Sequence, residues 1–225
     1  MKTILFDLDN TLLDFSKAEA EALKQVYEKY EIPLTEETIE VYENINAKLW
    51  EANEAGLLSR SELFSQRFTT VFTQLGKPIE SGRMIDDEYR RLLSESAHLI
   101  EGAGELLTEL KTAGHPLYIV TNGTPKVSRP RIEKSGIASF FKDVFVSEEI
   151  GTNKPSKAFF DYVFEHIPES SNDAVIVGDS LSSDIKGGID AGIQTIWFNP
   201  LSIQNDSGIV PDYEIKNLKE ILAYI

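Results

Sequence analysis

The chain of 225 residues contains no cysteine. Disulfides, thiolate metal ligands and cysteine nucleophiles are therefore excluded. No apolar run approaches the about 18 residues that a membrane span requires, and the start of the chain lacks the charged and then apolar segments of a secretory signal. We therefore expect a cytoplasmic protein that does not bind membranes.

Positive charge is scarce as well, with 22 lysines and arginines against 37 acidic residues and a formal net charge of −15. Polymeric nucleic acid needs a basic surface, so we do not expect it as a partner. A small anionic substrate is compatible with this charge, because a divalent cation and one or two lysines can reverse the local potential in a cleft. Hydrophobic residues at 41% and charged residues at 26% are typical of a soluble globular protein.

Two carboxylates end the first apolar run, in residues 6–11 (FDLDNT). Asp7 and Asp9 point the same way if the segment is extended. Two acids so close repel unless they share a proton or a cation, and a hard cation such as Mg²⁺ is the natural partner. The alternative is an Asp-rich turn in which Thr11 caps a helix.

Three later segments also place polar residues after apolar ones. In residues 120–123 (VTNG) a hydroxyl, an amide and a glycine backbone can hold phosphate oxygens, although a strand followed by an Asn-Gly turn has the same pattern. In residues 151–155 (GTNKP) Pro155 suits the first position of a helix, so Lys154 at that helix N-terminus calls for an anion, unless it is a surface lysine. In residues 178–184 (GDSLSSD) Asp179 and Asp184 follow an apolar run, although Asp184 also suits the first turn of a helix.

The four segments in this order resemble the signature of the haloacid dehalogenase (HAD) superfamily, over the whole chain. The forms VTNG and GxxKP are similar to the branch with a helical cap after the first motif, and within it to bacterial pyrimidine 5′-nucleotidases. The resemblance implies an α/β fold, a Rossmann-like doubly wound parallel sheet with an inserted all-helical cap.

The periodicity of the chain agrees with this division. Helical stripes fill residues 16–97, the expected cap, and strands alternate with helices in the expected core, residues 1–15 and 98–225. We expect strands at Lys2–Leu8, Pro116–Val120, Asp143–Ser147, Ala174–Val177 and Gln194–Phe198. We expect core helices at Ala103–Ala113, Lys126–Ser135, Ser156–His166, Ser182–Ala191 and Leu218–Tyr224.

The resemblance also implies a reaction. Asp7 would attack phosphorus to form an aspartyl-phosphate, and Asp9 would protonate the leaving oxygen and later deprotonate water. Thr121 and Lys154 would stabilise the transferring phosphoryl group. Mg²⁺ would be held by Asp7, the Asp9 backbone carbonyl and Asp179, with Asp184 nearby or bound through water.

Substrate contacts are expected from Thr11, Asn122 and Gly123 in the core and from Asn46 and Trp50 in the cap, where Trp50 could instead pack the helical bundle. The expected substrate is a small phosphorylated metabolite, a nucleoside 5′-monophosphate. Phosphoglycolate or a sugar phosphate is the alternative. A 2-haloacid dehalogenase and a non-catalytic phosphate-binding module are also open readings, and neither explains the acid at position 9 as well.

Overall fold

The computed structural model describes residues 1–225, which divide into two compact units. One unit joins residues 1–16 to residues 97–225, and the other contains residues 17–96. The second unit is therefore an insertion that follows the first strand of the first unit.

The first unit is built on a six-stranded parallel sheet in the order β3-β2-β1-β4-β5-β6. The strands are β1 Thr3–Phe6, β2 Leu117–Thr121, β3 Asp143–Val146, β4 Ala174–Gly178, β5 Gln194–Phe198 and β6 Tyr213–Ile215. The chain winds outward from β1 to β3 and then returns to β4 on the other side of β1. This reversal creates a topological switch point between β1 and β4, and ligands of open α/β sheets bind at the carboxyl ends of the strands at such a point.

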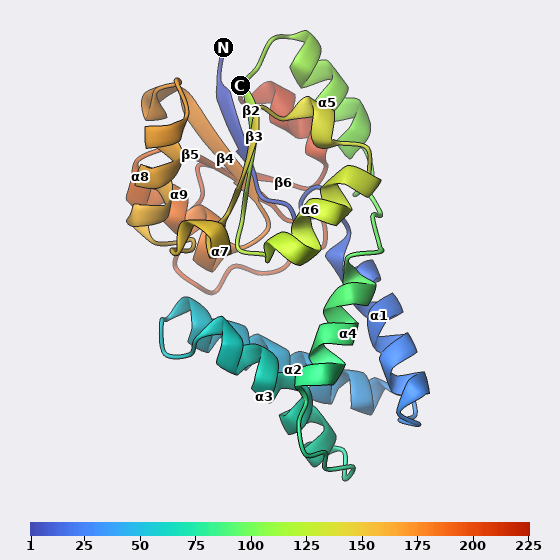
Figure 1. Cartoon of the computed structure of the whole chain (residues 1–225). Helices are drawn as coiled ribbons and strands as arrows, with labels where there is room; N and C mark the ends of the chain where they lie inside the picture. The colour runs from blue at the N-terminus through green and yellow to red at the C-terminus, as the bar shows by residue number, and fades with distance from the viewer. The chain divides into compact units, whose positions relative to one another are not determined.

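Helices cover both faces of this sheet (Figure 1). Ile4 and Phe6 of β1 face one core, which contains leucines of α5 (Ala103–Thr112) together with Ile132 of α6 (Pro125–Lys134). Leu5 faces the opposite core, with Phe159 and Phe160 of α8 (Lys157–His166). Side chains that alternate between two buried faces explain why the strands read as continuous apolar runs.

The remaining elements of this unit are short. They are η1 Ala138–Phe140, α7 Ser147–Ile150, η2 Ser171–Asp173, the π-helical turn η3 Leu181–Ile185, α9 Lys186–Ala191 and the 3₁₀ segment η4 Leu218–Ala223. The segment expected as one helix over Ser182–Ala191 is thus a π turn followed by α9, and the last expected helix is 3₁₀.

The inserted unit is all-helical. Its helices are α1 Phe15–Lys29, which begins in the first unit, α2 Glu36–Glu54, α3 Arg60–Gln74 and α4 Arg83–Leu93. Thr35 and Ser59 cap α2 and α3 with reciprocal capping boxes. Aromatic side chains form much of its core, including Tyr42, Phe68 and Tyr89, as expected for bundle packing.

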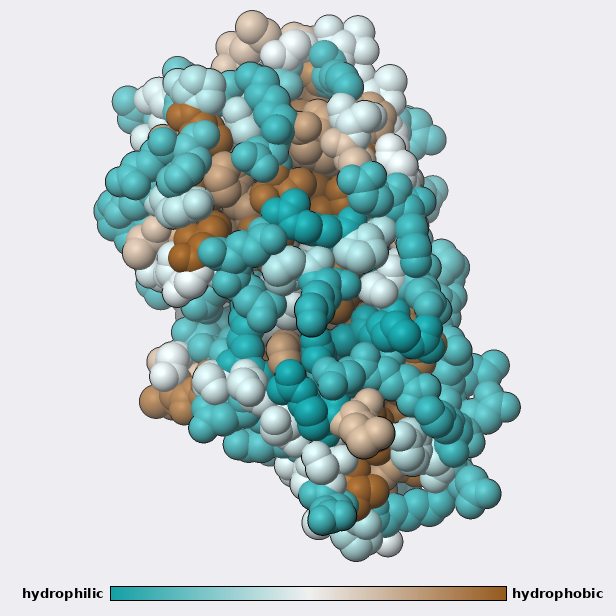
Figure 2. Space-filling view, in the orientation of Figure 1, coloured by the Kyte–Doolittle hydropathy of each residue, from teal (hydrophilic) through white to brown (hydrophobic).

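Hydrophilic residues predominate on the face drawn in Figure 2. None of the helices combines the length and the apolar character that crossing a membrane requires. The parallel sheet covered on both faces, with an inserted helical unit, confirms the predicted fold class.

Candidate active site

The sheet brings the first two motifs and the last one together at the carboxyl ends of β1, β2 and β4. In the parallel register Phe6 is level with Ile119 of β2 and with Val177 of β4, so the three strands end within two residues of one another. The Asp7 N–H extends this ladder by donating to the Val177 carbonyl at 2.9 Å. The residues that follow β1, β2 and β4 therefore share one site.

Lys154 is the cation at the centre of that site. Its side chain is 1% exposed, and Nζ donates to Asp7 Oδ1 at 2.7 Å, to Asp184 Oδ1 at 2.6 Å and to the Val120 carbonyl at 2.7 Å. All three ammonium hydrogens thus have acceptors. The lysine joins the first motif to the last through direct ion pairs.

The structure corrects the expected setting of Lys154. Helix α8 begins at Lys157 after the N-cap Ser156, so Pro155 is not its first residue and Lys154 is not at its N-terminus. Asn122 holds the lysine in place of a helix end. Its Oδ1 accepts from the Lys154 N–H at 2.9 Å and its Nδ2 donates to the Lys154 carbonyl at 2.9 Å.

The Asn122 side chain therefore holds the Lys154 backbone, and the phosphate contact expected of Asn122 stays a prediction. Gly123 has a steric reason to be glycine, since a Cβ there would lie 2.3 Å from Ser128 Oγ. Its N–H donates to Thr121 Oγ1 at 3.0 Å, and Thr121 is buried. Thr11 is also buried, and its Oγ1 has no hydrogen-bond partner in the protein.

Three carboxylates cluster at the site, and two of them are paired with the lysine. One oxygen from each of Asp7, Asp179 and Asp184 lies within 4.8 Å of the others. Gly178 permits this approach, because a Cβ on it would lie 2.3 Å from the Asp184 carboxyl group. Trp197 of β5 donates Nε1–H to the Asp179 carbonyl at 2.8 Å and so fixes the backbone that carries this acid.

Burial and mutual repulsion make the ionised forms of these acids costly. Burial is the largest cause that raises the pKa of Asp7, to about 7, with repulsion from Asp184 and Asp9 added and attraction to Lys154 opposing it. Burial, and then Asp7 and Asp184, raise the pKa of Asp179 to about 8. Burial opposes the charge of Lys154, but Asp184 and Asp7 outweigh it and raise the pKa of the lysine.

Three carboxylates with one ammonium group leave a surplus of negative charge. A divalent cation with a preference for oxygen ligands would neutralise this surplus, and the donor set therefore fits Mg²⁺. The Asp9 side chain is not one of the three clustered carboxylates, and metal binding by its backbone carbonyl stays a prediction.

The side chain of Asp9 turns instead toward Arg131 of α6, and the two form an ion pair. Sequence reasoning did not identify Arg131. The available signal was a charged residue within a buried stripe of α6, formed by Val127, Ser128, Arg131 and Ile132.

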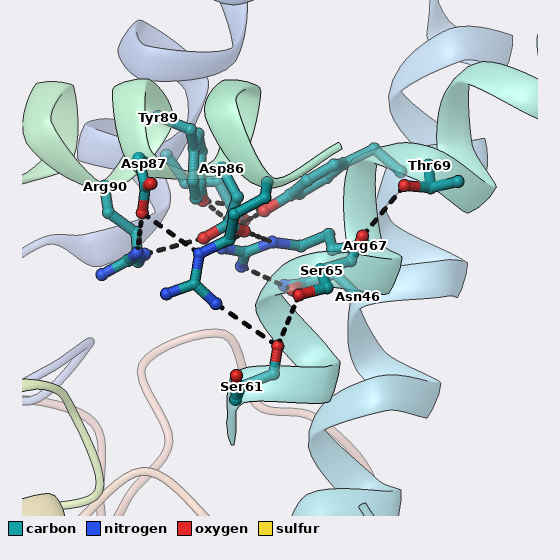
Figure 3. A network of polar contacts seen from close by, with 12 residues as sticks. Asn46, Ser61, Ser65, Arg67, Thr69, Asp86, Asp87, Tyr89 and Arg90 are labelled. Carbon is teal, nitrogen blue, oxygen red and sulfur yellow. Dashed lines mark hydrogen bonds and ion pairs between the residues drawn. The ribbon is translucent and has the colours of Figure 1, made fainter. Parts of the chain in front are cut away.

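In the helical unit the structure gives Asn46 a defined orientation. Arg67 of α3 donates to Asn46 Oδ1 at 3.0 Å and to Asp86 of α4 at 2.9 Å, as Figure 3 shows. An arginine only donates, so the amide oxygen of Asn46 must face Arg67 and its NH₂ group faces away. Trp50, one turn further along α2, has the Arg60 guanidinium 5.4 Å from its ring centroid.

Known proteins resemble the chain over nearly its whole length. HAD-hydrolase YfnB of Bacillus subtilis is 44% identical, over 98% of this chain and 93% of that protein. Pyrimidine 5′-nucleotidase PynA of Streptococcus pneumoniae is 34% identical, over 98% and 93% of the two chains. Pyrimidine 5′-nucleotidase YjjG of Escherichia coli is 30% identical, over 97% and 95%.

The fold gives the same result. A crystal structure of YfnB bound to magnesium superposes with a TM-score of 0.93 and covers 99% of this chain and 97% of that one. The family of haloacid dehalogenase-like hydrolases matches residues 4–198, which carry all four motifs. The chain belongs to the haloacid dehalogenase-like hydrolases.

Proposed function

We propose that this enzyme, a phosphatase of its family, hydrolyses phosphomonoesters through an aspartyl-phosphate on Asp7 with the help of Mg²⁺. The observation that carries the proposal is the arrangement around Asp7. One of its oxygens is paired with Lys154, two further carboxylates lie within 4.8 Å, and a separate acid stands two residues away. A nucleophile, a charge-balancing lysine and a distinct proton carrier are the groups that this reaction needs.

In this reaction Asp7 is the nucleophile and Asp9 transfers the protons. Asp7 Oδ2 is not paired with Lys154, so it is the oxygen placed to attack phosphorus. As the new bond forms, the ester oxygen leaves with its electron pair and takes a proton from Asp9. Asp9 then accepts a proton from the water that attacks the phosphorus of the aspartyl-phosphate, which releases inorganic phosphate and restores Asp7.

The metal would be held by Asp7, Asp179, Asp184 and the backbone carbonyl of Asp9. When bound, Mg²⁺ orients the phosphoryl group and neutralises its negative charge. The Thr121 hydroxyl and the positive charge of Lys154 stabilise the same group. Lys154 acts on it through charge, because its three N–H groups are bonded to the protein, and it also reduces the repulsion between Asp7 and Asp184. Thr11 Oγ1 is buried and has no hydrogen-bond partner within the protein, and its proposed contact with the substrate rests on the sequence motif.

We propose pyrimidine nucleoside 5′-monophosphates as the preferred substrates. Two relatives that match this chain over nearly its whole length are named pyrimidine 5′-nucleotidases. The Asn46 NH₂ group supports the proposal, because a donor held by Arg67 can recognise a carbonyl oxygen of a pyrimidine ring. Trp50 offers a ring on which a base can stack.

The test is a phosphate-release screen of the purified protein with Mg²⁺ over nucleotides, sugar phosphates and phosphoglycolate. We expect turnover to stop with EDTA and to return with Mg²⁺, and we expect Asp7→Asn to abolish it while the protein stays folded. Full activity after thorough chelation, or turnover by folded Asp7→Asn, would contradict the mechanism. A preference for phosphoglycolate or a hexose phosphate would contradict only the nucleotide assignment.

A further inference from the structure

Arg131 is a charged side chain with no exposed surface, and the mechanism above does not use it. It lies on α6, in the core unit, and its NH1 group donates to Asp9 Oδ1. The arginine side chain is 0% exposed, whereas that of Asp9 is 28% exposed. Arginine is almost never fully buried unless it is paired, so the partner of this guanidinium indicates what the burial serves.

The surroundings of Arg131 leave its guanidinium little freedom. Helix α6 carries it in a stripe with Val127, Ser128 and Ile132, all of which are buried. Its Cζ lies 5.5 Å from the ring centroid of Phe15, a distance at which a guanidinium is attracted to an aromatic face. The planar group is therefore held by its helix and by a ring while it meets Asp9.

The backbone of Asp9 is fixed by a separate set of contacts. The N–H groups of Leu12 and Leu13 donate to the Leu8 carbonyl at 3.0 and 2.9 Å, and the Asn10 N–H donates to the Leu13 carbonyl at 2.7 Å. Asn10 takes the left-handed conformation that this tight turn needs, with φ of 58°. Rotation of the Asp9 side chain is the freedom that remains, and the contact with Arg131 restricts it.

We propose that Arg131 is the positioning residue for proton transfer by Asp9, an inference that rests on the phosphatase function proposed above. The guanidinium occupies Asp9 Oδ1 and thereby directs Oδ2 to the ester oxygen. In the first step the proton on Oδ2 moves to that oxygen while its bond to phosphorus breaks and the Asp7 oxygen bonds to phosphorus. In the second step the same Oδ2 takes a proton from the attacking water.

This proposal predicts a dependence on the leaving group that a purely structural ion pair would not produce. An alkoxide leaves poorly and needs a proton, whereas p-nitrophenolate leaves without one. The value of kcat/KM reports only the steps up to release of the alcohol or phenol, so it isolates the first proton transfer. Loss of positioning should therefore lower kcat/KM for alkyl esters selectively.

The experiment compares wild type, Arg131→Met and Arg131→Lys on a nucleoside 5′-monophosphate and on p-nitrophenyl phosphate, each with Mg²⁺. We expect Arg131→Met to lower kcat/KM for the nucleotide by about 10- to 100-fold and that for p-nitrophenyl phosphate by less than about threefold, and we expect Arg131→Lys to restore part of the loss. Arg129→Met is the matched control. That arginine lies two residues earlier on α6, its side chain is 47% exposed and it pairs with Glu149, so neither substrate should be affected.

A double-mutant cycle with Asp9→Asn identifies the residue through which Arg131 acts. If Arg131 acts through Asp9, then Arg131→Met should change kcat/KM for the nucleotide by less than about threefold once Asp9 is already asparagine. Equal losses on the two substrates, or independent and additive losses in the cycle, would overturn the proposal.

Two further controls keep the result interpretable. Thermal unfolding of each variant shows whether it folds. If Arg131→Met does not fold, Arg131→Lys is compared with the wild type instead. We then expect a smaller loss of kcat/KM, confined to the nucleotide. A wild-type enzyme that hydrolyses neither ester would overturn the proposed function and the inference with it. An active wild type with parallel losses would overturn the inference alone.

Discussion

At the scale of single residues, the charge balance of the site depends on Lys154. It is the ammonium group that pairs with both Asp7 and Asp184, and it is almost completely buried. Removing one partner of a buried ion pair leaves an uncompensated charge in a poorly solvated place. The resulting loss of stability is larger than the net stabilisation that the pair provides.

We therefore predict that Lys154→Met lowers the free energy of unfolding of the metal-free protein by about 3–5 kcal/mol near neutral pH. Lys157→Met is the control, since Lys157 pairs with Asp161 on the surface with a side chain that is 64% exposed, and its loss should change the free energy by less than about 0.5 kcal/mol. Denaturant unfolding in EDTA measures both. Similar values for the two variants would show that Lys154 does not balance the acids.

Single residues also show what the sequence could reveal about the site. Asp7 and Asp179 directly follow strands β1 and β4, which end side by side, and Asp184 lies in the turn after β4. Strand ends of this kind can be read from apolar runs. Arg131 and Trp197 could not be found in this way. Their contacts with Asp9 and Asp179 depend on how a helix and a neighbouring strand pack, and the stripe on α6 marks Arg131 as buried without indicating its partner.

At the scale of secondary-structure elements, the strongly patterned segments were predicted well and the weak ones were not. The five longer strands lie within two residues of their expected bounds, because each contains a run of apolar residues. Strand β6 was missed, since it has three residues of which only Ile215 is buried. Helix α4 was not identified as a separate element, because most of its residues are charged and only Ile85, Tyr89 and the final leucines mark its buried side.

The position of Lys154 relative to helix α8 was also not predictable from the sequence. Proline is favoured at the first position of a helix, but the same residue also suits the turn before one. Tertiary contacts decided between these two, since the Asn122 side chain bonds both backbone groups of Lys154 and leaves the helix to begin after Ser156.

Trp50 lies on helix α2, and its proposed stacking on the base of the substrate can be tested by substitution. If Trp50 stacks on a base, Trp50→Ala should raise KM for nucleotides by about 5- to 100-fold, the range for loss of one aromatic stack, and Trp50→Phe should restore much of it. The value of kcat/KM for p-nitrophenyl phosphate should change by less than about twofold, because that ester has no base.

A further variant of α2 addresses the amide one turn earlier. Asn46→Asp keeps an oxygen for Arg67 but removes the NH₂ donor, so it should also weaken nucleotide binding selectively. Steady-state kinetics on both substrates measures these effects. Equal losses on nucleotide and p-nitrophenyl phosphate would show that Trp50 and Asn46 only pack the helical unit.

At the scale of the whole molecule, the surplus of negative charge should link stability to pH and to metal. The pKa values of Asp7 and Asp179 are raised to about 7 and about 8 in the folded chain, from about 4 when unfolded. Between pH about 4 and pH about 8 the folded chain therefore binds more protons than the unfolded chain. The stability that these two acids contribute to the folded state is fully present below pH about 4 and is lost as the pH rises through 7 and 8.

We predict that Mg²⁺ offsets this loss, and that the increase in melting temperature on adding Mg²⁺ is larger at pH 8 than at pH 6. At pH 6 the cation must displace protons from the carboxyl groups before it binds, which weakens its affinity. Asp179→Asn removes one of the raised acids and should reduce both the pH dependence and the Mg²⁺ effect. An equal increase in melting temperature at the two pH values would contradict the assignment of the metal to these acids.

The proposed reaction requires that Asp7 becomes covalently phosphorylated, and trapping this intermediate tests it most directly. The enzyme is mixed with Mg²⁺ and a nucleoside 5′-monophosphate, quenched in acid during turnover and reduced with borohydride, which converts an acyl phosphate to an alcohol. Peptide mass spectrometry should then find homoserine at position 7 in the wild type, and only when both substrate and Mg²⁺ are present. Turnover that leaves Asp7 unmodified, or modification at another carboxylate, would contradict the account.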